Sequence, residues 1–182
     1  KFGNCVDFGA SNANKFLNVN HNLGITSKIV TIICWVFLNT EVASGTYGFV
    51  SLANNTNKTV FIISYEYNSR ARRIHFALNK WGVGDTGVVN VTMTLGTARW
   101  YQLALTCDGT TLRAFVNGAQ VGNAAISGDG TSSPGDVTWI GYDKSNSGGY
   151  PSAKIDEVVF LGTALSPAEI RRRYAFQKGM LT

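Results

Sequence analysis

The sequence has few of the residues that metal sites and disulfide frameworks require. Its 182 residues include three cysteines and two histidines. Because the cysteines are odd in number, at least one of Cys5, Cys34 and Cys107 lacks a partner within the chain. None of them lies close in sequence to another ligand, as zinc motifs require, and His21 and His75 are equally isolated. This spacing matches no zinc motif. Cys34 lies inside the apolar run 32–37, so we expect it to be a small core residue. The alternative is a Cys5–Cys34 disulfide, which an N-terminal strand near that region would allow.

Charged residues are scarce and long apolar runs are absent. Charged residues make up 15% of the chain, against about a quarter in a typical globular protein, and Asn, Ser, Thr and Gly take their place. With 45% hydrophobic residues, this composition favours a folded, secreted or surface-exposed β-protein with polar loops over a disordered chain. No run approaches the roughly 18 apolar residues of a membrane span. The chain opens without Met or a leader, so we expect a mature domain or a piece of a longer protein.

The basic residues exceed the acidic ones and are clustered. Sixteen Lys and Arg against eleven Asp and Glu give a net charge of +5, concentrated at residues 70–73 and 171–173. A positive excess attracts nucleic acid, anionic glycans or acidic surfaces. The alternative interpretation is a solvated hairpin turn and a helix C-terminal end, where cations complement the helix dipole. Neither cluster accompanies the signature of a nucleic-acid-binding fold, so we expect no nucleic-acid partner.

Short apolar and alternating stretches, separated by turns rich in Gly and Asn, predict strands along nearly the whole chain. The predicted strands cover residues 1–8, 16–19, 29–38, 47–53, 59–67, 73–79, 88–95, 100–107, 111–116, 138–140 and 154–161. No helical pattern appears before residue 163. We therefore expect an all-β fold in which two antiparallel sheets pack face to face.

One short helix is predicted at the C-terminal end. Ser166 is its N-cap, Pro167 its first residue, and Glu169 completes a capping box. Gly179 ends it. Because the sequence shows no repeat, linker or second domain, we predict that residues 1–182 form a single domain.

The order of short motifs resembles a known family. The motifs are Val6-Asp7-Phe8-Gly9, Thr31-Ile32-Ile33-Cys34-Trp35-Val36, Ala104-Leu105-Thr106-Cys107-Asp108-Gly109, Leu112-Arg113-Ala114-Phe115-Val116-Asn117-Gly118, Ile140-Gly141, Ile155-Asp156-Glu157-Val158 and Ala164-Leu165-Ser166-Pro167-Ala168-Glu169-Ile170. Their number, order and spacing resemble the laminin-G-like jelly roll of the concanavalin A-like lectin/glucanase superfamily. One departure is that Asp7 precedes Phe8, where the family places the acid after the aromatic residue. The resemblance implies a jelly-roll sandwich and assigns Trp35 and Trp100 to core packing.

Catalysis can be tested against the acidic residues, because the same superfamily includes glycoside hydrolases. Those enzymes need two carboxylates about 5 Å apart, usually in a Glu-x-Asp-x-(x)-Glu pattern. None of the eleven acids fits that pattern. Glu66 is followed by two uncharged residues, and the adjacent Asp156 and Glu157 point to opposite faces of one strand. We therefore predict a protein without catalytic activity, with a glycoside hydrolase as the least favoured alternative.

The resemblance also implies a structural calcium site. In related domains the residue that matches Asp156 helps to hold Ca²⁺ together with N-terminal loop atoms, and calcium prefers oxygen ligands of this kind. Asp7, Asn4 and Asn12 are the nearest partners in that arrangement. The alternative is that Asp156 only accepts hydrogen bonds from backbone amides in a turn.

Loop aromatic residues are the candidates for ligand contacts, because sugar rings stack on aromatic faces while amides and carboxylates bind hydroxyls. Trp81 precedes a Gly-rich loop, and a long polar loop lies between two tyrosines. The predicted glycan-binding residues are Trp81, Tyr142, Asp143, Asn146 and Tyr150. The alternative is that Trp81 caps the core and the polar loop is only a connector.

Together, these features predict a non-catalytic, glycan-binding recognition module of a larger extracellular, cell-surface or virion-surface protein, with a glycan or glycoprotein as partner. A protein-interaction or assembly domain is the main alternative.

Overall fold

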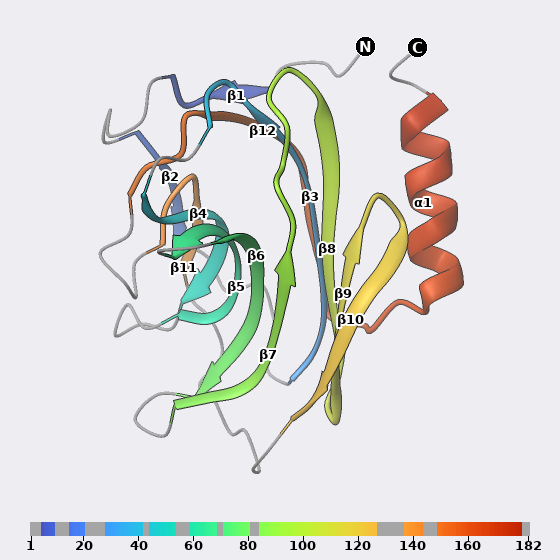
Figure 1. Ribbon diagram of the computed structural model, residues 1–182. Coiled ribbons are helices and arrows are strands. Elements are labelled where there is room, and N and C mark those ends of the chain that lie inside the picture. The colour runs from blue at the N-terminus through green and yellow to red at the C-terminus, as the bar shows by residue number, and fades with distance from the viewer. Residues whose placement is uncertain are drawn as a thin grey trace.

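The computed structural model describes residues 5–9, 15–20, 28–41, 44–53, 59–68, 71–80, 84–126, 137–143 and 149–179, which form two stacked six-stranded sheets (Figure 1). The first sheet has the order β1 (Val6–Asp7), β12 (Ala153–Leu161), β3 (Ile29–Leu38), β8 (Trp100–Asp108), β9 (Thr111–Val116) and β10 (Ala119–Ala125). The second has the order β2 (Leu17–Asn20), β11 (Val137–Ile140), β4 (Gly45–Ala53), β5 (Thr59–Asn68), β6 (Ala71–Lys80) and β7 (Gly84–Thr92). Neighbouring strands pair antiparallel in both sheets. The predicted jelly-roll sandwich is confirmed.

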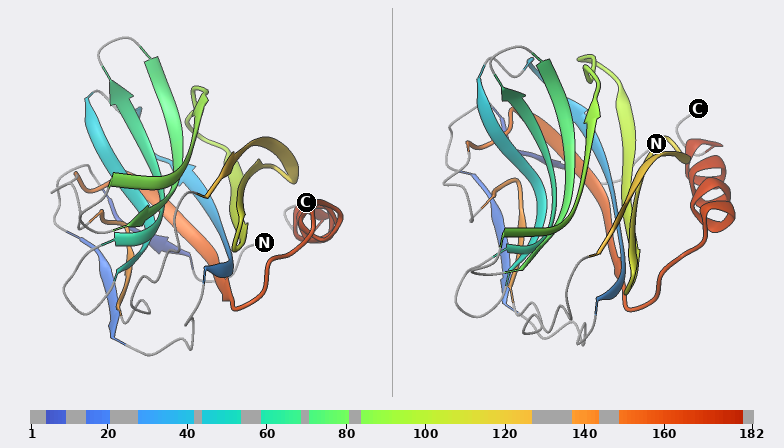
Figure 2. Two further views of the ribbon diagram at one scale, coloured as in Figure 1. Left: turned by 90° about the horizontal axis from the view of Figure 1, so that it is seen from below. Right: turned by 60° about the horizontal axis from the view of Figure 1, so that its bottom comes forward.

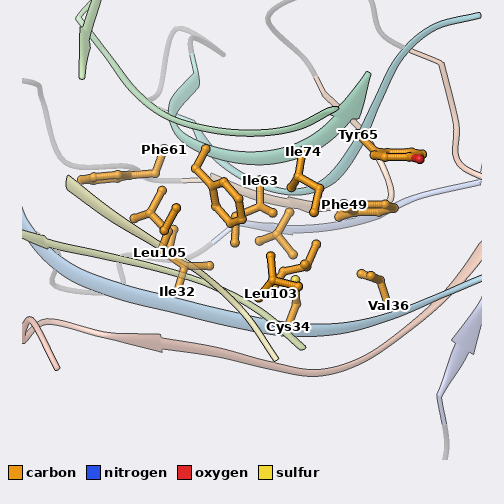
Figure 3. Packing of buried hydrophobic residues seen from close by; sticks show 14 of the residues in the cluster. Ile32, Cys34, Val36, Phe49, Phe61, Ile63, Tyr65, Ile74, Leu103 and Leu105 are labelled. Carbon is orange, nitrogen blue, oxygen red and sulfur yellow. The ribbon is translucent and has the colours of Figure 1, made fainter. Parts of the chain in front are cut away.

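The core lies between the two sheets, because every second side chain of their strands points toward the opposite sheet. Ile32, Cys34 and Val36 on β3 are buried and face the second sheet, whose Ile63 and Ile74 are buried opposite them (Figure 3). Full burial of an aliphatic side chain stabilises a fold by roughly 1.5–3 kcal/mol. The alternate residues of these strands point outward, so each sheet also presents an outer face.

Three strand predictions need correction. Residues 119–125 form β10, which the sequence did not predict, because small and polar residues give this stretch little strand propensity. It is a strand because the turn before it folds it onto β9. Strand β7 spans Gly84–Thr92 and not residues 88–95. Leu95 lies beyond its end, and the Leu95 N–H donates to the Tyr65 hydroxyl at 2.9 Å and not to a neighbouring strand. Strand β1 includes only Val6–Asp7 of the described residues.

The one helix of the described residues, α1 (Pro167–Gly179), packs on the outer face of the first sheet, on the side away from the second sheet (Figure 2). Its capping box is as predicted: the Glu169 N–H donates to Ser166 Oγ at 3.3 Å, and Glu169 Oε2 accepts from the Ser166 N–H at 2.8 Å. The bonds that Glu169 Oε2 accepts, first from the Ser166 hydroxyl at 2.7 Å and then from the Ser166 N–H, lower the pKa of Glu169. Among the described residues, this helix is not long and apolar enough to cross a membrane.

The structure corrects three placements that the sequence predicted, those of Trp35, of Trp100 and of the arginines at 171–173. Trp35 is buried, as predicted, but under α1 and not between the sheets. Its ring stacks on Tyr174 at 5.7 Å, and its Nε1–H donates to Gln177 Oε1 at 2.9 Å. Trp100 is only half-buried and packs against Phe37. The arginines at 171–173 lie in the middle of the helix and not at its C-terminal end.

All three cysteines are free, so the Cys5–Cys34 disulfide does not form. The physical reason is the strand order, because β12 lies between β1 and β3 and separates the two thiols. Burial raises the pKa of the Cys34 thiol far above its usual value. This cysteine is therefore a core residue, as predicted.

Candidate functional site

The segment after β11 crosses the outer face of β4. A side chain at Gly48 would collide with the backbone of Tyr142 and Asp143, so only glycine allows this close approach. The Ser51 hydroxyl donates to the Tyr142 carbonyl at 3.2 Å. Further along, the Gly149 N–H donates to the Thr46 carbonyl at 2.7 Å. Strand β4 therefore holds both described ends of the segment.

These attachments bring four aromatic side chains together, which we call the aromatic cluster: Phe16, Trp139, Tyr142 and Tyr150. Tyr142 and Tyr150 are stacked, with ring centroids 5.0 Å apart and planes inclined by 14°. Phe16 lies 5.6 Å from Tyr142, 6.1 Å from Tyr150 and 5.0 Å from Trp139. Offset contacts of this kind are favourable between aromatic rings. The cluster lies at the β2–β11 side of the second sheet.

The four side chains of the aromatic cluster differ in how far they are exposed to solvent. Trp139 is buried and forms its base, Tyr142 and Tyr150 are half-buried, and Phe16 is 39% exposed. Burial, followed by the charges of Tyr150 and Asp143, raises the pKa of the Tyr142 phenol. Tyr142 therefore stays neutral at physiological pH, and the cluster offers an uncharged, partly exposed aromatic surface of the kind on which a sugar ring stacks.

A polar network lies on the outer face of the same sheet, which is concave (Figure 2). Glu66 on β5 is buried and binds the Arg73 guanidinium at 2.7 Å, while its other oxygen lies 3.9 Å from His75 Nδ1. His75 Nδ1 lies 2.8 Å from Asn90 Oδ1. Among the described residues, Glu66 therefore has a guanidinium and an imidazole ring beside it. A retaining glycoside hydrolase would need a second carboxylate about 5 Å from the first.

The structure brings together only part of the predicted glycan site. Tyr142 and Tyr150 are in contact, as a shared site requires. Asp143 is adjacent in sequence to Tyr142 but is 0% exposed. Trp81 and Asn146 lie outside the described residues.

Sequence reasoning missed Phe16 and Trp139 as site residues. Both were predicted only as residues of strands, and the pairing of β2 with β11 brings them together. The sequence contained one indication, because Trp139 is an aromatic residue in a predicted strand. It did not show that β2 would pair with β11 and bring Phe16 beside Trp139.

The predicted calcium ligands are also only partly described. Asp7 Oδ1 accepts from the Gly9 N–H at 2.9 Å and from Asn39 Nδ2 at 3.1 Å, and Lys154 Nζ lies 4.0 Å from Oδ2. The backbone bond from Gly9 is the main reason that the pKa of Asp7 is lowered. Asp156 Oδ1 accepts from the Glu157 N–H at 2.8 Å, and its Oδ2 is buried without a hydrogen-bond partner among the described residues.

In the part of the chain that the structure describes, no three His, Cys, Asp or Glu side chains are placed to share a metal ion. Of the two predicted ligands that the structure describes, Asp7 already accepts two hydrogen bonds, and Asp156 has a buried oxygen without a described partner. Asn4 and Asn12 lie outside the described residues. The calcium prediction thus depends on residues beyond the described ranges.

A family model agrees with this architecture. The Laminin_G_3 model, described as concanavalin A-like lectin/glucanases superfamily, matches residues 9–171. The chain belongs to this superfamily. No curated protein matches it in sequence.

Solved structures of the same fold include binding domains of botulinum neurotoxins. The binding domain of botulinum neurotoxin DC, in complex with rat synaptotagmin II, has a TM-score of 0.73 and 12% identity over 96% of this chain and 45% of its own. The botulinum neurotoxin type G receptor-binding domain has a TM-score of 0.62 and 16% identity over 91% and 43%. A heptameric pentraxin from Limulus polyphemus has a TM-score of 0.58 and 13% identity over 80% and 69%. This superfamily chain spans less than half the length of the toxin domains, and the likeness concerns the fold.

Proposed function

We propose that this chain is a non-catalytic, glycan-binding recognition module of a larger extracellular or virion-surface protein. The observation that carries the proposal is the aromatic cluster, in which Phe16, Tyr142 and Tyr150 present partly exposed rings at one side of the second sheet. Membership of a superfamily that includes lectins supports it. So does the likeness to the receptor-binding domain of botulinum neurotoxin type G and to the binding domain of botulinum neurotoxin DC, which binds rat synaptotagmin II.

In this proposal the rings and the neighbouring polar groups have separate roles. Tyr150 and Phe16 stack against a sugar ring, and Tyr142 supports Tyr150 from behind. Asp143 holds the segment in place from its buried position. Trp81 and Asn146 add contacts from their loops, as the sequence predicts.

A glycan array followed by titration of the best hit tests the proposal. Loss of one stacking ring removes roughly 1–1.5 kcal/mol, so we expect Tyr150→Ala and Phe16→Ala each to weaken binding about tenfold. Trp81→Ala tests the loop prediction in the same assay. Phe176→Ala is the matched control, because this exposed aromatic residue lies on α1, away from the cluster. A hit whose affinity is unchanged by the first two substitutions would show that the cluster is not the glycan site.

A protein-interaction domain is the second candidate, because β2 exposes Leu17 and Val19 beside Phe16. Apolar side chains on a short edge strand are a feature of protein contacts. This function predicts no array hit and a complex that Leu17→Asn disrupts, with Tyr150→Ala having a smaller effect.

A further inference from the structure

The outward side of α1 is a continuous, exposed surface. Ala168, Arg172, Ala175, Phe176 and Gly179 are all exposed and follow one another at positions i, i+4, i+7, i+8 and i+11. This spacing places them on one side of a helix. The opposite side holds the helix to the first sheet through buried Ile170 and through Tyr174 and Gln177. The helix therefore has one side packed on the first sheet and one side exposed to solvent.

Phe176 is the most exposed large apolar side chain among the described residues. It is 69% exposed, whereas the next value is 43%, for Val19. It lies beside Leu165 in a shallow groove that Arg172 and Arg173 also line. Transfer of an exposed aromatic ring from water into an apolar phase lowers the free energy of the system. Phe176 therefore favours contact with such a phase.

The helix that carries this ring is strongly basic. The helix contains Arg171, Arg172, Arg173 and Lys178 against the single acid Glu169, so it carries +3 of the net charge of +5. By helical geometry, Arg171 and Lys178 project to one flank of the outward side and Arg173 to the other. None of the four forms an ion pair with another described residue. Glu169 is occupied by the capping box.

We propose that α1 lies flat on an anionic lipid bilayer, with Phe176 inserted between the headgroups and the four basic side chains contacting anionic lipids. The combination favours a bilayer over other anionic partners. A nucleic acid or a soluble acidic glycan would use the cations but would leave the ring in water, whereas a bilayer accommodates both. With one inserted ring, the attachment is weak and reversible.

This inference is independent of the proposed glycan site. The helix covers the outer face of the first sheet, and the aromatic cluster belongs to the second sheet, so the two surfaces lie on different layers (Figure 2). Substitutions on one surface leave the other intact. Failure of either proposal can therefore be recognised separately.

Co-sedimentation with large unilamellar vesicles tests the proposal. The whole chain is mixed with phosphatidylcholine vesicles that contain either 30 mol% phosphatidylserine or none. We expect binding to the anionic vesicles only, and weakening as the salt concentration rises. Phe176→Ala should reduce the partition coefficient roughly tenfold, because the inserted ring is lost. Phe176→Trp should restore it, since Trp favours the interface.

The charge dependence needs a matched pair of variants. Arg171→Gln/Lys178→Gln removes two flanking cations and should reduce partitioning about 25-fold, or roughly fivefold for each cation near the surface. Arg99→Gln/Lys154→Gln lowers the net charge equally, away from the helix, and should have little effect. Val121→Ala, an exposed apolar residue on β10, is the control for Phe176→Ala.

Three outcomes would overturn the proposal. The first is the absence of binding to the anionic vesicles. The second is an equal loss in the two double variants, which would mean that net charge alone acts. The third is vesicle binding that does not change in Phe176→Ala while the chain binds heparin equally well, which would identify a general polyanion surface. Unchanged circular dichroism of Phe176→Ala would show that a loss does not come from unfolding.

Discussion

At the scale of single residues, Asp108 organises the turn between β8 and β9. Its Oδ1 accepts from the Thr110 N–H at 3.0 Å, the Thr110 hydroxyl at 2.8 Å and the Thr111 N–H at 2.8 Å. Its Oδ2 binds Arg113 Nη1 at 2.6 Å. The bond from Arg113, followed by those from Thr110 and Thr111, holds the pKa of Asp108 far below its usual value. One carboxylate therefore accepts hydrogen bonds from four donors that would otherwise be hydrated.

The substitution Asp108→Asn should lower the free energy of unfolding at pH 7 by about 1–2 kcal/mol, a value reduced because the side chain is about one-third exposed. The folded-state pKa is depressed, so this contribution is fully present above the unfolded-state pKa near 4. It is lost as the pH falls toward the folded-state pKa. Urea unfolding from pH 7 down to pH 2 should therefore show the wild-type and variant curves converging in acid. A constant difference across that range would contradict the role of the charge. Glu41→Gln, at an exposed ion pair, is the control.

At the scale of secondary-structure elements, the turn between β9 and β10 positions α1. Asn117 and Gly118 have φ values of 51° and 74°, which define a two-residue type I′ turn. A Cβ at Gly118 would lie 2.8 Å from the Cβ of Tyr174 on the helix. The hairpin and the helix are therefore packed so closely that only glycine fits between them.

Gly118→Ala should combine two penalties, a strained positive φ and a collision with Tyr174, and should lower the free energy of unfolding by roughly 2–3 kcal/mol. Two other glycines separate these penalties. Gly45 has a φ of 86° but open space around it, so Gly45→Ala should cost only about 1 kcal/mol. Gly162 has neither constraint, and Gly162→Ala should be neutral. Urea midpoints that rank the three variants in another order would disprove the close-packing interpretation.

The elements were predictable where the local signal was strong. The apolar run of β3 and the capping box of α1 were predicted with the bounds observed or nearly so, because burial and backbone hydrogen bonds fix them locally. Strand β10 was missed because its formation depends on the turn and on β9. Likewise, Tyr142 and Tyr150 were predictable as loop aromatic residues, whereas Phe16 and Trp139 join them only through the pairing of strands that are distant in sequence.

At the scale of the whole molecule, the sandwich separates two surfaces of different chemistry. The second sheet carries the uncharged aromatic cluster, and the helix outside the first sheet carries +3 of the net charge of +5. A rigid double layer between them keeps their spacing fixed. A module of this kind is suited to contact a glycan on one side while its other side lies against an anionic surface.

Calcium binding would connect the two ends of the chain, because Asn4, Asp7 and Asn12 come from its beginning and Asp156 from β12, which pairs with β1. If the ion binds as the resemblance implies, a concentration of 100 times its Kd stabilises the fold by about 2.7 kcal/mol, which raises the Tm by roughly 5–10 °C. Chelation with EDTA should reverse this rise, which thermal unfolding would measure. Asp156→Asn should abolish the calcium effect, because it removes the charge of a carboxylate whose Oδ2 is buried without a described partner, whereas the neighbouring Glu157→Gln should retain it. A Tm that responds to neither calcium nor EDTA would leave Asp156 as a purely structural residue, which accepts the Glu157 N–H at a bulge in β12.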